Sequence, residues 1–119
     1  MNRPQTLAEI LTGDLPGVIA DFQGIIVDIN EHFEIFTGWE KQEIIGQLIS
    51  VILPIYFRES HHMGFSRFTA SGVATILNHP LELKVITKDE REILSEHYIL
   101  AEKQDDKWSF GATLRPLES

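Results

Sequence analysis

The spacing of hydrophobic residues changes near Gly72. Before Gly72, apolar residues occur in short runs and at helical spacing. After it they alternate with polar residues, as they do along a half-buried strand. Leu81, Leu83 and Val85, for example, are separated by charged residues. The pattern therefore predicts strands and short helices in the first part of the chain and strands in the last part.

The N-terminal part predicts one hairpin between short helices. Residues 5–11 form an amphipathic pattern that ends near Gly13. The β-branched runs 18–22 and 25–29 flank a turn that contains glycine, which is typical of a hairpin. Asn30 suits the N-cap of a short helix closed by Gly38, and residues 41–45 predict a further helical turn.

The clearest helical pattern runs from Tyr56 to Ala70. Phe57, Phe65 and Phe68 fall on one stripe of this helix, and His61 lies on the same stripe. The alternating region that follows predicts a strand at 81–85, a turn at 87–90, a long strand at 91–103, a turn at 104–107 and a last strand at 108–115. Short connections make these strands antiparallel neighbours. We therefore expect an α+β fold, a five-stranded antiparallel sheet with the helical middle covering one face.

Composition and charge narrow the classes of function. The chain has 119 residues, enough for one domain, with 43% hydrophobic and 24% charged residues. Its formal net charge of -8 argues against a nucleic-acid or anionic-membrane surface. No apolar run approaches the ~20 residues of a membrane span, and no signal peptide pattern opens the chain, so we expect a cytoplasmic module. The absence of cysteine excludes disulfides, thiol catalysis and Cys-ligated metals.

The order of several short motifs resembles the PAS sensor-domain family. The motifs are Gly24-Ile25-Ile26-Val27-Asp28-Ile29-Asn30, Phe36-Thr37-Gly38-Trp39, Glu43-Ile44-Ile45-Gly46, Leu53-Pro54, Phe65-Ser66-Arg67-Phe68, Pro80-Leu81-Glu82-Leu83 and Lys88-Asp89. The resemblance implies a helical cap at 1–15, a PAS sensor domain at 16–116 and, at 117–119, the start of a linker to an output domain. Two positions depart from the pattern. Glu90 stands where the family usually has glycine, which favours a different turn type, and Pro116 interrupts the usual exit.

The function implied by the resemblance is sensing and dimerisation in a bacterial signalling protein. Such a protein would be a histidine kinase, a diguanylate cyclase/phosphodiesterase of cyclic di-GMP signalling, or a chemoreceptor. The module would bind a small ligand between sheet and helices, or act as an interaction module, and would not be an enzyme. No phosphate-cradling glycine loop or nucleophile site is visible in the sequence.

Haem is the alternative ligand, with His61 as the iron ligand. In haem-binding PAS oxygen sensors the proximal histidine lies on the helix to which His61 is assigned. The distal arginine of those sensors aligns with Leu81, so that part of the motif is missing here. A packed histidine with one hydrogen bond is the other interpretation. FAD is less expected than haem, and flavin adduct chemistry is excluded because it requires a cysteine.

The long strand carries two polar candidates for the cavity wall. The family alignment points Ser95 and His97 inward, where a ligand could satisfy their hydrogen bonds. The alternative is a one-residue slip or bulge that turns His97 to solvent. Further cavity-lining candidates are Phe36, Phe65, Phe68 and Leu81.

A homodimer is expected to use the N-terminal helix and the outer sheet face. Leu7, Ile10 and Leu11 are apolar on the helix, and Leu94, Tyr98 and Leu100 would lie on the outer face. An apolar face on both sides of a sheet requires a cover. We expect the helix and a second protomer to share it.

Overall fold

Five antiparallel strands form one sheet in the order β2-β1-β5-β4-β3. The computed structural model describes residues 3–56 and 80–117. The strands are β1 (Gly17–Ala20), β2 (Ile26–Ile29), β3 (Pro80–Ile86), β4 (Glu92–Gln104) and β5 (Lys107–Pro116). The helices are α1 (Leu7–Thr12), α2 (Glu31–Thr37), α3 (Lys41–Ile44) and the 3₁₀ helix η1 (Ile49–Ile52). The predicted α+β class with a five-stranded antiparallel sheet is confirmed.

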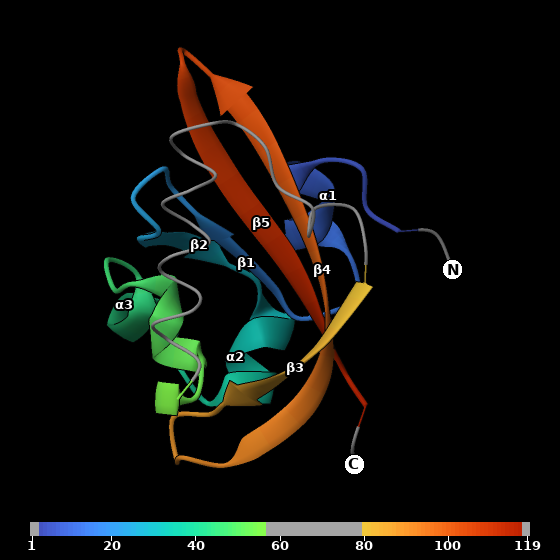
Figure 1. Ribbon diagram of the computed structural model, residues 1–119, viewed down its shortest axis with the longest axis vertical. Helices are drawn as coiled ribbons and strands as arrows, with labels where there is room; N and C mark the ends of the chain where they lie inside the picture. The colour runs from blue at the N-terminus through green and yellow to red at the C-terminus, as the bar shows by residue number, and fades with distance from the viewer. Residues whose placement is uncertain (1–2, 57–79, 118–119) are drawn as a thin grey trace.

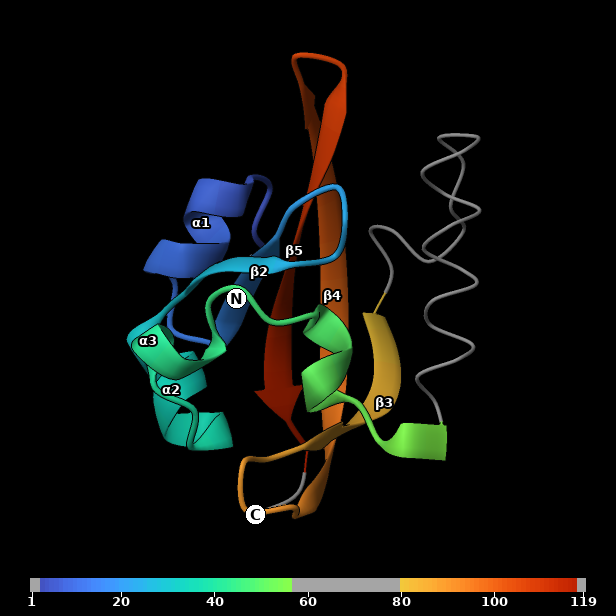
Figure 2. The ribbon, with the colours of Figure 1, turned by 90° about the vertical axis from the view of Figure 1, so that its left-hand side faces the viewer.

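Local sequence signals explain the first helices. Thr6 caps α1, its side chain accepting a hydrogen bond from the Glu9 amide at 3.1 Å. Asn30 caps α2, and Gly38 closes that helix with a φ of 81°, a conformation that glycine adopts without strain. In both views α2 and α3 lie near the β3–β4 turn (Figures 1 and 2).

The two long hairpins use left-handed residues in their turns. Asp105 and Asp106 have φ values of 52° and 64°, which suits the two-residue turn that joins β4 to β5. This hairpin projects beyond the rest of the sheet at the top of Figure 1. Glu90 has a φ of 67° in the β3–β4 turn. The glutamate itself thus adopts the left-handed conformation that glycine favours. The expected change of turn type stays a prediction.

Hydrophobic residues cover both faces of the sheet. We call the face that carries the larger cluster the inner face; its buried members are Val18, Ile26, Ile29, Phe33, Ile44, Ile52, Leu53, Val85 and Leu114. We call the opposite face the outer face; there α1 packs Ile10 against Ile19 and Leu100. Gly111 makes this close approach feasible, because a Cβ there would lie 2.7 Å from Leu7 Cδ2 and 2.8 Å from Ile10 Cδ1.

The predicted helix from Tyr56 to Ala70 lies outside the described residues apart from Tyr56. The strand predictions agree with the structure to within a few residues. The apolar run 18–22 leaves the sheet after Ala20, and β5 continues to Pro116. Proline is tolerated there because β1 pairs with β5 only as far as Thr113, so the missing Pro116 amide is not needed by that neighbour.

Candidate functional site on the inner face of the sheet

The register of β3, β4 and β5 builds the wall in which the polar candidates lie. Leu81 pairs with His97 and Leu83 with Ser95 across β3 and β4, and His97 pairs with Leu114 on β5. Because side chains alternate along a strand, Ser95 and His97 point to the same face as buried Leu114. Both lie on the inner face.

Ser95 and His97 are buried in this wall. Ser95 is 0% exposed and His97 is 5% exposed. The Ser95 hydroxyl donates a hydrogen bond to the Ile93 carbonyl oxygen at 3.2 Å. The pairing of β4 with both neighbours contains no slip or bulge around these residues, so the solvent-facing alternative for His97 is not seen. Contact of either side chain with a ligand stays a prediction.

The other predicted lining residues divide into two groups. Phe36 is half-buried and packs against the inner cluster, and Leu81 is half-buried beside His97. His61, Phe65 and Phe68 lie outside the described residues. The structure therefore brings together the sheet side of the predicted site, namely Leu81, Ser95 and His97, with Phe36 contacting the same inner core.

Trp39 is a buried polar group that the sequence did not single out for this role. Its ring packs against the inner cluster, with Lys88 Nζ 5.5 Å from the ring centroid. The indole Nε1 is buried, and no described residue accepts its hydrogen bond. Buried donors are normally paired, so this group is a candidate contact for a polar ligand atom. The Thr-Gly-Trp motif does not predict an unpaired indole donor, because an aromatic residue after Thr-Gly is ordinary packing in the family that the chain resembles.

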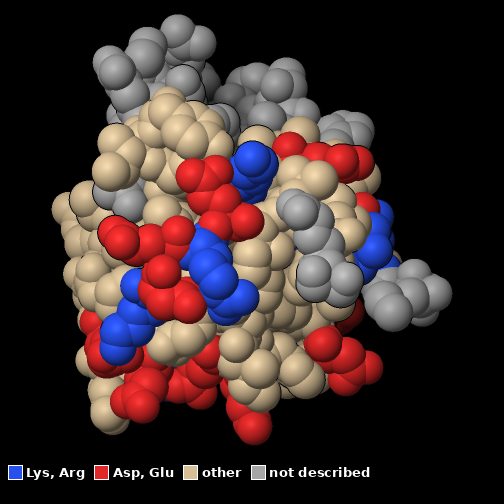
Figure 3. Space-filling model, turned by 90° about the horizontal axis from the view of Figure 1, so that it is seen from below, with Lys and Arg blue, Asp and Glu red and all other residues tan. Residues whose placement is uncertain are grey.

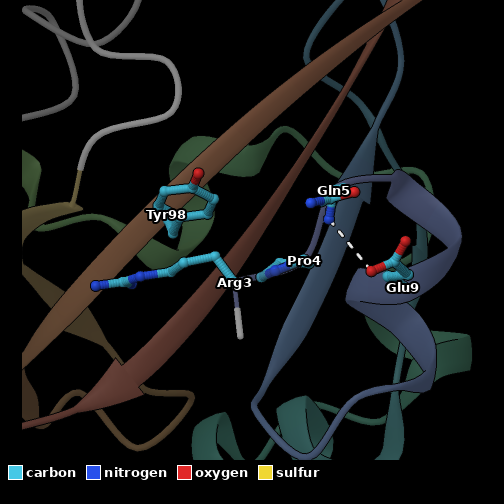
Figure 4. A pocket seen from close by; sticks show the side chains of 5 residues that line it. All are labelled: Arg3, Pro4, Gln5, Glu9 and Tyr98. Carbon is cyan, nitrogen blue, oxygen red and sulfur yellow. Dashed lines mark hydrogen bonds between the residues drawn. The ribbon is translucent and has the colours of Figure 1, made fainter. Parts of the chain in front are cut away.

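The outer face carries a second group of polar residues. Arg3, Pro4, Gln5, Glu9 and Tyr98 line a shallow hollow beside the start of α1. Figure 4 shows the Arg3 side chain running along the Tyr98 ring, and the guanidinium carbon lies 5.0 Å from the ring centroid. Arg3 also forms an ion pair with Glu96. The outer face near Tyr98 is thus covered by the chain's own N-terminal residues.

Residues 3–56 and 80–117 contain neither a metal-ion cluster nor a membrane-spanning helix. Within these ranges, no group of three His, Asp or Glu side chains is arranged to hold a metal ion. The helices in the same ranges are too short or too polar to cross a membrane.

Sequence comparison gives one distant relative. No protein-family model matches the chain. An uncharacterised protein of Azorhizobium caulinodans is 25% identical over 101 residues, which are 84% of this chain. The match spans 14% of the length of that relative.

Structural comparison is more informative. A PAS domain from Colwellia psychrerythraea matches with a TM-score of 0.73 and 18% identity, covering 92% of each chain. The PAS domain of an HTR-like protein from Haloarcula marismortui matches with a TM-score of 0.72 and 18% identity, over 93% of this chain and 88% of that one. The PAS domain of the Cronobacter turicensis quorum-sensing receptor RpfR, in complex with C12:0, matches with a TM-score of 0.67 and 18% identity, over 89% of this chain and 96% of that one.

Proposed function

This chain has the PAS-domain fold, and from that premise we propose that it is a sensory module of a bacterial signal-transduction protein. Its task is binding, with no reaction of its own. The protein that contains it is a histidine kinase, a diguanylate cyclase/phosphodiesterase or a chemoreceptor, located in the cytoplasm. The short share of the Azorhizobium relative that the chain matches fits a module within a larger protein.

The observation that carries the ligand proposal is the burial of Ser95 and His97 in an apolar wall. Their cross-strand neighbours on the inner face include Leu81, Leu83 and Leu114. A hydroxyl and an imidazole keep hydrogen-bonding capacity beside a partner in the protein, and a few polar groups set in an apolar wall are the usual means of orienting a ligand's polar end. We therefore expect a small, largely apolar ligand with one polar end. The RpfR domain in complex with C12:0 is a precedent for a ligand of this class on this fold.

Mass spectrometry of the denatured, extracted protein tests this proposal directly. We expect a co-purified small molecule, or a rise in melting temperature on adding dodecanoic acid. Ser95→Ala and His97→Gln should reduce occupancy, whereas His32→Gln, the same change at an exposed histidine, should not. An empty extract together with an unchanged melting temperature would overturn ligand binding.

An absorption spectrum distinguishes the haem alternative from the proposed small apolar ligand. Its iron ligand would be His61, which lies outside the described residues. We expect no Soret band from protein purified without additions. A band that disappears in His61→Ala would replace the leading proposal with a haem-based gas or redox sensor.

The partner proposed for this module is a second copy of the chain. The helix part of the sequence-based expectation agrees with the structure, because α1 of the same chain covers Leu100, and Tyr98 packs against the same cluster. The second copy would share this face with α1 and contact both the helix and the sheet beside it. Light scattering of a variant lacking residues 1–13 should give monomers or aggregates, and an unchanged dimer mass would contradict this proposal.

A further inference from the structure

Two arginines from opposite ends of the described chain share one carboxylate on the outer face. Arg3 precedes α1, and Arg115 lies near the end of β5. Both form ion pairs with Glu96 of β4, and the Arg115 Nη2 to Glu96 Oε2 distance is 2.9 Å. The Glu96 side chain is 13% exposed, so this pairing is screened by solvent less than a fully exposed pair would be.

The sequence restricts the backbone of both arginines. Each is followed by proline, as Arg3-Pro4 and Arg115-Pro116. A residue before proline favours extended conformations, because the proline ring clashes with that residue's backbone when it is helical. Both arginine backbones are therefore restricted before the ion pairs form, which lowers the entropy lost on pairing.

The strand register shows why the two arginines matter to Glu96. Glu96 pairs with Arg115 on β5 and with Glu82 on β3. Like charges directly opposite each other destabilise a sheet. The two guanidinium groups offset this repulsion, and the Arg3 guanidinium packs on Tyr98 of the same strand.

Each arginine lies next to a segment that has its own attachment to the sheet. On the N-terminal side, the Leu7 amide donates to Glu102 Oε2 at 2.8 Å. On the C-terminal side, the Leu117 amide donates to the Leu94 carbonyl oxygen at 2.9 Å. Glu96 lies between Leu94 and Glu102 on β4, so it can influence both attachments.

We propose that Glu96 is a latch: its carboxylate holds the N-terminal segment and the end of β5 on the outer face together, so that releasing one arginine loosens the other. The physical basis is that both ion pairs use the same oriented Glu96 carboxylate. Either arginine fixes the rotamer of Glu96, and the second then binds an acceptor that is already oriented. The latch lies on the opposite face from the proposed ligand wall and does not depend on a ligand.

Residue-resolved hydrogen exchange on the full chain tests the latch. The reporters are the amides of Leu7 and Leu117. Glu96→Gln should speed exchange of both by about three- to fivefold, the size expected for loss of one or two partly exposed ion pairs. Glu92→Gln, the same change on the same face of β4, should affect neither reporter.

The two arginine variants supply the decisive comparison. Arg115→Gln should speed exchange at Leu7 as well as at Leu117, and Arg3→Gln should speed exchange at Leu117 as well as at Leu7. Both arginine side chains are nearly half exposed, so these variants should fold even if Glu96→Gln does not. Effects confined to the nearer reporter, or no effect, would overturn the latch.

Discussion

Asn30 shows how much a single side chain contributes to this fold. Its Oδ1 accepts hydrogen bonds from the amides of Phe33 and Gly17, both at 2.9 Å. Its Nδ2 donates to the Leu15 carbonyl oxygen at 2.8 Å. The amide therefore caps α2 and also ties the start of β1 to the segment that follows α1. An acceptor alone would keep the bonds from Phe33 and Gly17 but would lose the bond to Leu15.

Asn30→Asp separates the two roles. Aspartate keeps the capping oxygen but replaces the donor by a second acceptor, which faces the Leu15 carbonyl oxygen. We expect a loss of about 1–3 kcal/mol in the free energy of unfolding, measured by denaturant titration. Asn30→Ala, which removes the cap as well, should lose about 1 kcal/mol more. Wild-type stability in Asn30→Asp would show that the donor contributes nothing.

At the scale of elements, α1 is held by packing rather than by its own helical stability. It spans Leu7–Thr12, far below the length at which an isolated helix is stable in water. Its buried Ile10 contacts Ile19 and Leu100, and the backbone of Gly111 leaves room for this contact. The docking of α1 on the sheet should therefore depend on the absence of a side chain at Gly111.

Gly111→Ala should weaken the docking of α1. The added Cβ would lie within 2.8 Å of the Leu7, Ile10 and Ile19 side chains, so these side chains must repack against the sheet. We expect a loss of about 1–3 kcal/mol in thermal or denaturant unfolding, together with faster proteolysis before residue 13.

Ser109→Ala, two positions earlier on β5, is the matched control and should leave both measurements unchanged. Equal stability of Gly111→Ala and the wild type would mean that the α1 contact tolerates a methyl group, contrary to the packing described above.

At the scale of the whole molecule, acidic residues exceed basic ones, yet the two signs are interspersed. Figure 3 shows Lys and Arg among Asp and Glu on the lower face. Ion pairs join Lys41 to Asp28 and Lys88 to Glu43. The Lys88 hydrogen bond lowers the pKa of Glu43, and hydrogen bonds from Arg3 and Arg115 lower the pKa of Glu96 to about 2. Several carboxylates thus favour the folded state only while ionised.

The sign of the pH effect follows from these lowered pKa values. In the unfolded chain Glu96 titrates near its ordinary pKa of 4.5, and in the folded protein near 2. Between these values the unfolded state binds more protons, so acid favours unfolding. The stabilisation by Glu96 should be complete above about pH 5 and disappear as the pH falls to about 2.

Melting temperatures measured from pH 7 to pH 2 test this expectation. The wild type should be nearly constant above pH 5 and fall steeply below it. The melting temperature of Glu96→Gln should be lower at pH 7 and fall less steeply with decreasing pH, because the titrating carboxyl group is gone. Parallel curves for the two proteins would show that Glu96 is not linked to folding.

Local patterns in the sequence were sufficient for much of this structure. The alternation after Gly72 predicted the late strands, and Asn30 and Gly38 predicted the bounds of α2, because these signals act between neighbouring residues. The inward orientation of the Ser95 and His97 side chains was also predicted, from alternation combined with the family resemblance. Their contact with a ligand, and the roles of His61, Phe65 and Phe68, remain predictions.

Other features depended on contacts between distant segments. The sequence did not show that Arg3 and Arg115 meet at Glu96 or that Trp39 buries its indole donor. Hydrophobic period and capping act over a few residues, whereas these contacts join residues far apart in the chain. Only the strand order β2-β1-β5-β4-β3 brings them together, because it places β1 beside β5 and both chain ends along β4.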